Sequence, residues 1–570
     1  MPRFAPVWSA ISRRRFIKFA SGIGVGVALS VTTLSACQPS ADVADGPADA
    51  PTEAADTGGT IRIGMTASDI PMTAGAPNSG FEGVRFTGMT LYDALVTWDL
   101  SVDDQPAPLV PQLATSWSVD EGDPRIWTFN LRQGVKFHDG SDFNADAVIF
   151  NFEKIFDESA PHYDAQQSAQ VVARLPTYES IRKIDDYTVE ITTTSPSSLL
   201  INQLPFMFFS SPAHYEALGG DWAAFATDPS GTGPFMLEQL VPRERAVLVP
   251  NPNYWDETRM AQADRIELIP IPEGTTRANA LLAGEVDWIE APPSDTLAML
   301  ESRGFTITRN GYPHLWPWQF SFVEGSPWTD KRLRQAANLA INREEIQALL
   351  GGNMVPAQGI LLPDDPAFGN PAFEVTYDPD QALELMEEVG YGPDNPVDVK
   401  MLISSSGSGQ MQPLPMNELI QQQLAAVGIN VDFEVLVWET LFDNWRQGAE
   451  SADSRGAHGT NITFATHDPF AAMMRFVYSE SAPPNSLNWG YYSNPEVDAL
   501  IEELQMAFDP EENLAVYQRL HEVLVEDAPF LFVAHDVGPR AMRSEITGFV
   551  QAKSWFQDIT PISMGQMARQ

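Results

Sequence analysis

From about residue 60 onward, the hydrophobic pattern alternates between strand-like and helix-like segments. Residues 61–63 and 127–131 place apolar and polar side chains in turn, which predicts half-buried strands. Asn144 then precedes a segment with Val148 and Phe152 on one helical face, which predicts a helix capped by Asn144. Strands and helices are therefore interleaved along the chain.

The clearest unit lies in the later half. Asp378 predicts the start of an amphipathic helix that ends at Gly390. Residues 399–403 predict a buried strand, residues 416–427 a helix and residues 429–435 an alternating strand. A strand, helix and strand in this order predict a parallel pair joined by a right-handed crossover. The fold class we expect is α/β.

The length of the chain indicates more than one core. A single hydrophobic core rarely extends beyond about 250 to 300 residues, and this chain has 570. No long linker divides residues 60–570, so we expect lobes joined by crossings of the chain.

The charge of the chain excludes one class of partner. Asp and Glu number 76 against 34 Lys and Arg, which gives a net charge of −42. Five basic and five acidic residues in 1–59 cancel, so the excess belongs to residues 60–570. Phosphate backbones repel such a surface, and we expect no nucleic-acid partner. With 44% apolar residues the chain is rich enough to fold, so the acidity does not indicate disorder.

The N-terminus has the features of an export signal. Arg13 and Arg14 precede the weakly apolar residues 19–36, and this arrangement resembles a twin-arginine signal. Cys37 follows Leu34-Ser35-Ala36, which resembles a lipoprotein box. We predict a signal peptide over residues 1–36, a lipid on Cys37 that attaches the protein to the membrane, and an acidic flexible tether over 37–59. The alternative is an uncleaved membrane anchor.

The composition argues against several kinds of chemistry. Cys37 is the only cysteine, so no thiol remains for disulfides, metal ligation or catalysis once it is lipidated. The eight histidines include no His-Glu-x-x-His motif, and no Walker loop occurs. We predict no catalytic residues, no metal site and no cofactor. ATP-driven transport would need a separate ATPase.

A long stretch carries a family likeness. Residues 127–154, WTFNLRQGVKFHDGSDFNADAVIFNFEK, resemble the signature of the extracellular solute-binding proteins of the peptide/nickel ABC importer family, known as family 5. Shorter matches follow the family's order at residues 91–96, 111–117, 231–235, 251–255, 280–287, 333–343 and 494–498.

The resemblance implies an architecture and a role. The fold would be a two-lobed periplasmic-binding-protein-like α/β fold of the large, peptide-binding type. The first lobe would comprise residues 60–313 plus 537–570 and the second residues 314–536, with a hinge between them. A solute bound in the cleft would favour the closed state, which an ABC permease then reads. The protein would be a monomeric, lipid-anchored receptor outside the cytoplasm, with the permease and its ATPase subunits as partners.

In this family, the segment that enters the second lobe faces the cleft. In this chain the segment is rich in aromatic and imidazole side chains. His314, Trp316 and Trp318 lie within it. The two tryptophans are two residues apart, so on an extended chain both point the same way and could form a stacking wall for the solute. The alternative is that one or both are core residues.

A second candidate is the segment around His467 and Asp468. Peptide-binding relatives place a carboxylate three residues before the acidic-Pro pair, where it neutralises the α-ammonium of the peptide, but this chain has Ala465 there. This departure weakens a peptide assignment unless Asp468 or another acid substitutes. His467 and Asp468 could instead bind a metal chelate or a polar solute. The alternative is that Asp468 only begins a turn and His467 is exposed.

Four further residues complete the ligand-binding candidates. Glu82 and Arg85 lie where early residues of the first lobe line the cleft in relatives, and could pair with charged groups of the solute. The alternative is a solvated surface pair. Trp438 and Trp489 are weaker aromatic candidates, with a core position as the alternative.

The sequence leaves several functions open. An oligopeptide or peptide-like solute is the first expectation, because it is the centre of the family. A metal chelate, an opine or an oligosaccharide is the alternative within solute binding, and Ala465 together with the aromatic residues favours it. Outside that class, the alternatives are an exported lipoprotein hydrolase and a sensory or chaperone-like module. Turnover of ester, glycoside or peptide substrates would separate a hydrolase from a binding protein.

Overall fold

The protein is described here from a computed structural model. Residues 55–570 form one compact unit. Within that unit the structure describes residues 58–77, 80–407 and 409–565. The predicted signal peptide with Arg13 and Arg14, the predicted lipid site at Cys37, and the predicted tether as far as residue 57 lie outside the described residues.

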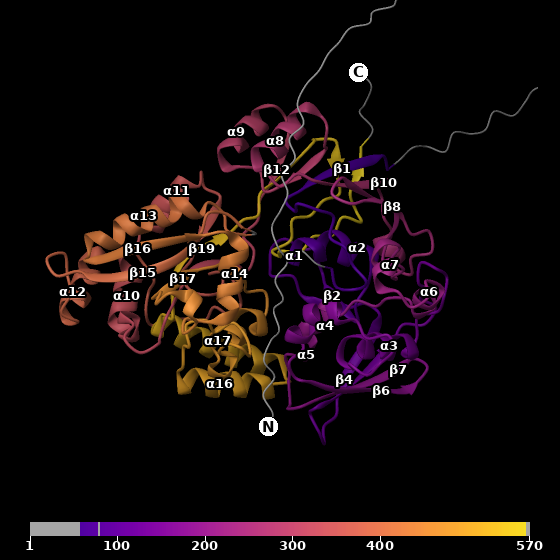
Figure 1. Ribbon diagram of the computed structural model, residues 1–570, viewed down its shortest axis with the longest axis horizontal. Coiled ribbons are helices and arrows are strands. Elements are labelled where there is room, and N and C mark those ends of the chain that lie inside the picture. Colours follow the sequence, from indigo (N-terminus) through magenta and orange to yellow (C-terminus); the bar gives the residue numbers. More distant parts are fainter. Residues whose placement is uncertain (1–57, 78–79, 408, 566–570) are drawn as a thin grey trace, which may run out of the picture. The chain divides into compact units, whose positions relative to one another are not determined.

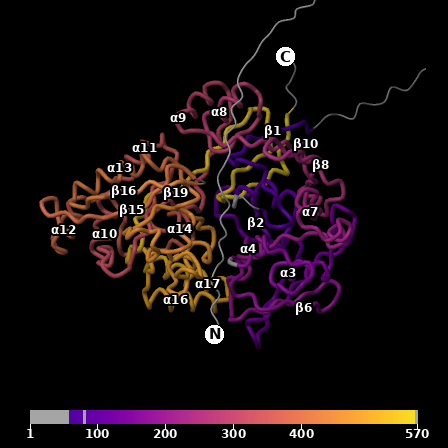
Figure 2. Tube along the Cα trace, viewed as in Figure 1, coloured from indigo at the N-terminus to yellow at the C-terminus, as the bar shows by residue number. Residues whose placement is uncertain are grey.

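The first large sheet is built around strand β1, which confirms the strand predicted at residues 61–63. Its order is β12-β20-β11-β1-β10-β9-β8, and β1 runs parallel to β10 and β11. Ile61 and Ile63 are fully buried. The strands are β1 (Thr60–Met65), β8 (Phe235–Val241), β9 (Arg245–Pro250), β10 (Arg265–Pro270), β11 (Trp288–Glu290), β12 (Thr306–Thr308) and β20 (Arg540–Met542). Because β20 lies near the end of the chain, the sheet is completed only when the chain returns to it (Figure 2).

Smaller sheets accompany the first large one. A four-stranded sheet has the order β4-β5-β7-β6, and β2-β3 and β21-β22 are two-stranded. The strand predicted at residues 127–131 is β5, so that prediction is confirmed. These strands are β2 (Val96–Trp98), β3 (Leu109–Pro111), β4 (Ala114–Val119), β5 (Ile126–Leu131), β6 (Tyr178–Asp185), β7 (Thr188–Thr193), β21 (Ile546–Thr547) and β22 (Ser563–Met564).

Helices connect the strands of the first large sheet and of the smaller sheets. The carboxamide oxygen of Asn144 accepts the N–H of Ala147 at 3.1 Å, which confirms the predicted cap of α3. The α-helices are α1 (Gly80–Gly83), α2 (Met89–Leu91), α3 (Ala145–Phe156), α4 (Ala165–Val171), α5 (Leu200–Gln203), α6 (Pro212–Ala217), α7 (Trp222–Thr227), α8 (Gly274–Ala283) and α9 (Ser294–Ser302). Short 3₁₀ or π segments are η1 (Val84–Gly88), η2 (Val172–Arg174), η3 (Leu204–Phe206) and η4 (Glu257–Arg259).

The second large sheet is built from the middle of the chain (Figure 1). Its order is β14-β19-β13-β17-β15-β16, and β18 pairs with β13 beside this path. The strands are β13 (His314–Phe320), β14 (Met354–Pro356), β15 (Val397–Ser404), β16 (Ile429–Leu436), β17 (Gly459–Asn461), β18 (Phe464–Ala465) and β19 (Phe530–Asp536). We call the parts around the first and second large sheets the first and second lobes.

The predicted βαβ unit and capped helix are both confirmed in the second lobe. Strands β15 and β16 pair in parallel along their whole length, with helix α13 between them in the chain. Asp378 caps α12 by accepting the N–H of Gln381 at 2.9 Å. The helical segments are α10 (Lys331–Ala340), α11 (Arg343–Leu349), α12 (Pro379–Glu388), α13 (Pro413–Ala426), α14 (Trp438–Gln447), α15 (Arg475–Val477), α16 (Pro495–Met506), α17 (Pro510–Asp527), η5 (Pro327–Thr329), η6 (Ala452–Ser454), η7 (Phe470–Met474) and η8 (Ser479–Ser481).

Each lobe has its own hydrophobic core, and one residue of the first lobe belongs to the core of the second. Leu199, just before α5, is buried among residues of α16 and α17. The neighbouring Ser198 donates its backbone N–H to the carbonyl of Gln505 at 2.8 Å and its hydroxyl to that of Leu504 at 2.7 Å. The segment before α5 therefore joins the two lobes by direct contact.

Candidate functional site

The chain crosses between the lobes twice, and the two crossing segments are bonded to each other. Residues 309–313 lead from β12 to β13, and residues 537–539 lead from β19 to β20. The hydroxyl of Tyr312 donates to Oδ2 of Asp536 at 2.9 Å. Burial raises the pKa of Tyr312 well above its usual value, and the charge of Asp536 acts in the same direction. The phenol therefore stays protonated and keeps this bond.

A buried ionic cluster lies beside the crossings. Nη2 of Arg85 lies 3.1 Å from Oε2 of Glu290, and Nε of Arg540 donates to Oε1 of Glu290 at 3.2 Å. The indole of Trp288 donates to the same Oε1 at 3.0 Å. Burial by itself would raise the pKa of Glu290, but Arg540 and Arg85 hold it below its usual range. We call Arg85, Trp288, Glu290 and Arg540 the Glu290 cluster.

Glu82 and Arg85 both lie inside the protein, so the alternative of a solvated surface pair is wrong. The carboxylate of Glu82 accepts the backbone N–H groups of Thr66 and Ala67 at 2.7 and 3.0 Å. It therefore anchors the end of β1. The guanidinium carbon of Arg85 is 5.6 Å from the ring of Trp555, and that ring lies 4.3 Å from the ring of His314, at the entry to the second lobe.

His314 lies at the entry to the second lobe and contacts both lobes. Its ring stacks on Tyr312 and lies 4.3 Å from the ring of Trp555, while Thr463 Oγ1 lies 3.0 Å from its Nε2. A Cβ at Gly409 would be 2.4 Å from its Cε1, so the loop before α13 also packs closely against it. Burial lowers the pKa of His314 to about 3. The ring is therefore neutral at physiological pH.

Trp316 and Trp318 do point the same way along β13, but toward helix α13. The indole of Trp316 donates to the carbonyl of Gln410 at 3.0 Å, and that of Trp318 to Oδ1 of Asn417 at 2.7 Å. Both side chains are fully buried in a core cluster of the second lobe. The contacts match the alternative that both tryptophans are core residues. The face of β13 on which they lie packs against α13 and does not face a solute.

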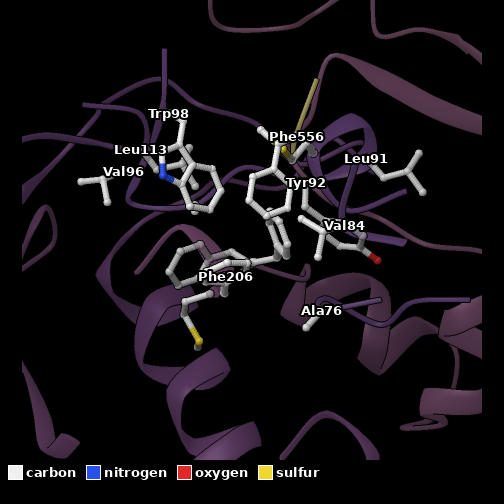
Figure 3. Packing of buried hydrophobic residues seen from close by; sticks show 14 of the residues in the cluster. Ala76, Val84, Leu91, Tyr92, Val96, Trp98, Leu113, Phe206 and Phe556 are labelled. Atoms are coloured by element: carbon white, nitrogen blue, oxygen red, sulfur yellow. The ribbon is translucent and has the colours of Figure 1, made fainter. Parts of the chain in front are cut away.

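His467 reaches from the second lobe into a group of rings of the first. Its ring lies 5.5 Å from that of Trp98, 6.2 Å from that of Phe206 and 6.0 Å from that of Phe556. Trp98 stacks on Phe556 with 4.4 Å between ring centroids. Figure 3 shows Trp98, Phe206 and Phe556 gathered at one place in the first core. We call these three residues and His467 the aromatic cluster, and its position shows that His467 is not exposed.

Asp468 is likewise a buried residue. It accepts the backbone N–H of Ala471 at 2.8 Å and so begins the turn into η7. Its Oδ2 lies 2.9 Å from Nε2 of His467. Ala465 is buried in β18 opposite His314. Asp468 thus combines a turn-forming role with a position at the lobe boundary.

Trp489 and Trp438 lie in the second lobe. Trp489 is fully buried, and its indole donates to Oδ1 of Asn444 at 3.3 Å, which matches the core alternative. Trp438 is half-buried at the start of α14, and its ring leaves no room for a Cβ at Gly407. It therefore packs beside the same loop that approaches His314.

The sequence reasoning missed one arginine at the aromatic cluster and another in the second lobe. Arg174 ends η2 in the first lobe, and its guanidinium carbon lies 4.3 Å from the ring of Phe206. Arg475 begins α15 in the second lobe. Burial lowers the pKa of each to about 10, so both are cations at neutral pH. The sequence does contain a feature that could have indicated them. Each is a lone arginine within an apolar run, at residues 171–175 and 472–477.

Buried polar side chains from both lobes also lie near this boundary. Within the described part of the chain, the amides of Gln203 and Gln410 and the hydroxyl of Thr466 have no hydrogen-bond partner. Gln203 is four residues after Leu199 and so shares the helix face that meets the second lobe. Thr466 precedes His467, and the carbonyl of Gln410 accepts the indole of Trp316. Buried polar groups are nearly always bonded, so those at this boundary are suited to a polar ligand.

No group of three or more His, Cys, Asp or Glu side chains in the described ranges could hold a metal ion. None of the helices in that same part of the chain is long and apolar enough to cross a membrane.

Known proteins are similar to this chain in sequence. Heme-binding protein A of Haemophilus influenzae is 26% identical over 83% of this chain and 86% of its own length. The glutathione-binding protein GsiB of Escherichia coli K12 is 28% identical over 82% of this chain and 90% of its own length. These relatives are binding proteins rather than enzymes.

A solved structure has the same fold. The periplasmic binding protein DppA of Helicobacter pylori, in complex with the peptide STSA, superposes with a TM-score of 0.74 at 23% identity, over 90% of this chain and 99% of that one. The two-lobed α/β fold predicted from the sequence is therefore confirmed. The pattern of bacterial extracellular solute-binding proteins, family 5 Middle, matches residues 108–493, and the chain belongs to this family.

Proposed function

We propose that the protein binds a peptide or peptide-like solute between its lobes and delivers it to the permease of an ABC importer. The main support for this proposal comes from the boundary between the lobes. Polar side chains of both lobes are buried there without a hydrogen-bond partner, near the aromatic cluster. A solute that touches both lobes would satisfy these groups and favour closure. The peptide in the related DppA structure and the glutathione in the name of GsiB support this class of solute.

The lobes and the membrane attachment are part of the proposal. We assign residues 60–313 plus 537–570 to the first lobe and residues 314–536 to the second, which agrees with the residues of the two large sheets. Arg13 and Arg14 would direct export, and a lipid on Cys37 would hold a monomeric protein at the outer side of the cytoplasmic membrane. Mass spectrometry of the membrane-extracted protein tests this, because a chain that still begins at Met1 would contradict it.

Ligand binding tests the proposal directly. A solute that binds only the native state raises the melting temperature of the purified protein. We expect a shift with members of a library of di- to pentapeptides, and none with matched metal chelates, opines or oligosaccharides. A shift from the latter only would replace the peptide assignment with the alternative cargo. Turnover of chromogenic esters, glycosides or peptides would instead support a hydrolase.

A further inference from the structure

Each lobe buries an apolar side chain of the other, at a contact separate from the two crossing segments. Leu199 of the first lobe is 1% exposed and packs in the core of the second lobe, whereas the next residue, Leu200, packs in the core of the first. In return Phe508, between α16 and α17, packs against the core of the first lobe, with its ring 5.9 Å from that of Trp127. The lobes therefore exchange apolar side chains.

The same contact caps a helix across the lobe boundary. The last carbonyls of an α-helix have no N–H partner within the helix. At the end of α16, Ser198 donates its backbone N–H to the carbonyl of Gln505 at 2.8 Å and its hydroxyl to that of Leu504 at 2.7 Å. The carboxamide of Asn513 in α17 donates in turn to the Ser198 hydroxyl oxygen at 3.3 Å. The first lobe thus supplies donors that a helix of the second lobe requires.

Separation of the lobes would break all of these interactions at once. Leu199 and Phe508 would meet water, and the carbonyls at the end of α16 would lose their donors from Ser198, and both changes are unfavourable. The first lobe would keep the packing of its own core, because Leu200 and not Leu199 contributes to it. The contact can therefore open and form again as a unit. Since it includes no part of a solute, it also acts in the empty protein.

We propose that Ser198, Leu199 and Phe508 form a latch that holds the lobes together in the absence of solute. Closure then does not wait for the solute, and a solute enters only while the latch is open. A site that is accessible for a fraction of the time has an apparent affinity lowered by that fraction, so the latch also sets how tightly a solute is retained. The inference concerns the empty protein and does not depend on whether the solute is a peptide.

Hydrogen exchange and small-angle X-ray scattering test the latch in the empty protein. The full-length wild type is freed of carried solute, which native mass spectrometry verifies. The backbone N–H of Ser198 should exchange slowly, because it donates to Gln505 when the lobes are together. In the variants L199S and F508S this N–H should exchange about tenfold faster or more, and the radius of gyration should increase.

Two checks separate opening of the lobes from unfolding. Circular dichroism tests the fold of each variant, and since Leu199 and Phe508 come from different lobes, one variant remains if the other fails to fold. L349S changes a leucine that is 42% exposed at the end of α11, and it should alter neither readout. The inference is wrong if Ser198 exchanges as fast in the empty wild type as in the variants, or if a folded variant is as compact as the wild type.

Discussion

The Glu290 cluster and the aromatic cluster both lie near the lobe boundary, but different interactions hold them together. Arg85 and Arg540 contact one buried carboxylate at 3.1 and 3.2 Å, so the protein supplies the counter-charge of the first cluster. In the second cluster, the ring of His467 from the second lobe lies 5.5 Å from that of Trp98, which stacks on Phe556 of the first lobe. The first cluster therefore depends on ion pairs, and the second on the packing of rings across the boundary.

Removing the carboxylate of the first cluster should give the largest effect. In Glu290→Gln, Arg85 and Arg540 remain buried without their counter-charge, and we expect the free energy of unfolding to fall by about 3 to 5 kcal/mol. Urea denaturation followed by circular dichroism measures this loss. Glu301→Gln, which breaks an exposed pair with Arg309, serves as the control and should change stability by about 0.5 kcal/mol or less. A loss below about 1 kcal/mol in Glu290→Gln would show that the cluster is not needed for folding.

Truncating a ring in the second region should cost somewhat less. Phe206→Ala removes packing against Trp98 and Phe556, and we expect a loss of about 3 kcal/mol of unfolding free energy. Thermal and urea unfolding measure it, and Tyr377→Ala, at a half-exposed ring, is the control. Stability equal to that of the wild type would mean that the aromatic cluster is not packed in the unliganded protein.

Acid should weaken the first cluster. The pKa of Glu290 is lowered in the folded protein, so its stabilising contribution is present above its unfolded pKa of about 4.5 and is lost as the pH falls through the lower folded value. The stability difference between wild type and Glu290→Gln should therefore shrink below pH 4.5, by up to about 1.4 kcal/mol per pH unit. Urea titrations from pH 6 to pH 3 measure the difference. A gap that stays constant or widens would contradict the assignment of an ionised Glu290.

Local signals in the sequence predicted much of the fold. Asn144 and Asp378 cap helices through bonds to residues three positions away, and the pattern of residues 399–435 predicted a parallel strand pair. Caps and strand patterns depend on residues that are close in the chain, so they can be recognised from the sequence alone. The family resemblance added the two lobes, which local patterns do not reveal.

The site was less predictable, because it depends on which face of each element meets the other lobe. His314 and His467 lie at the boundary, as expected. The spacing of Trp316 and Trp318 correctly predicted that both side chains point the same way, but it could not show that they point into the core. Trp98 and His467 are 369 positions apart in the chain, and only the packing of the lobes brings their rings within 5.5 Å of each other.

Identification of the solute that the protein carries tests the central claim most directly. Native mass spectrometry of the wild-type protein, purified without denaturation, should reveal one bound solute per chain, and the released compound should be a peptide or a peptide-like molecule. A bound solute of another class, such as a metal chelate, an opine or an oligosaccharide, would contradict the account.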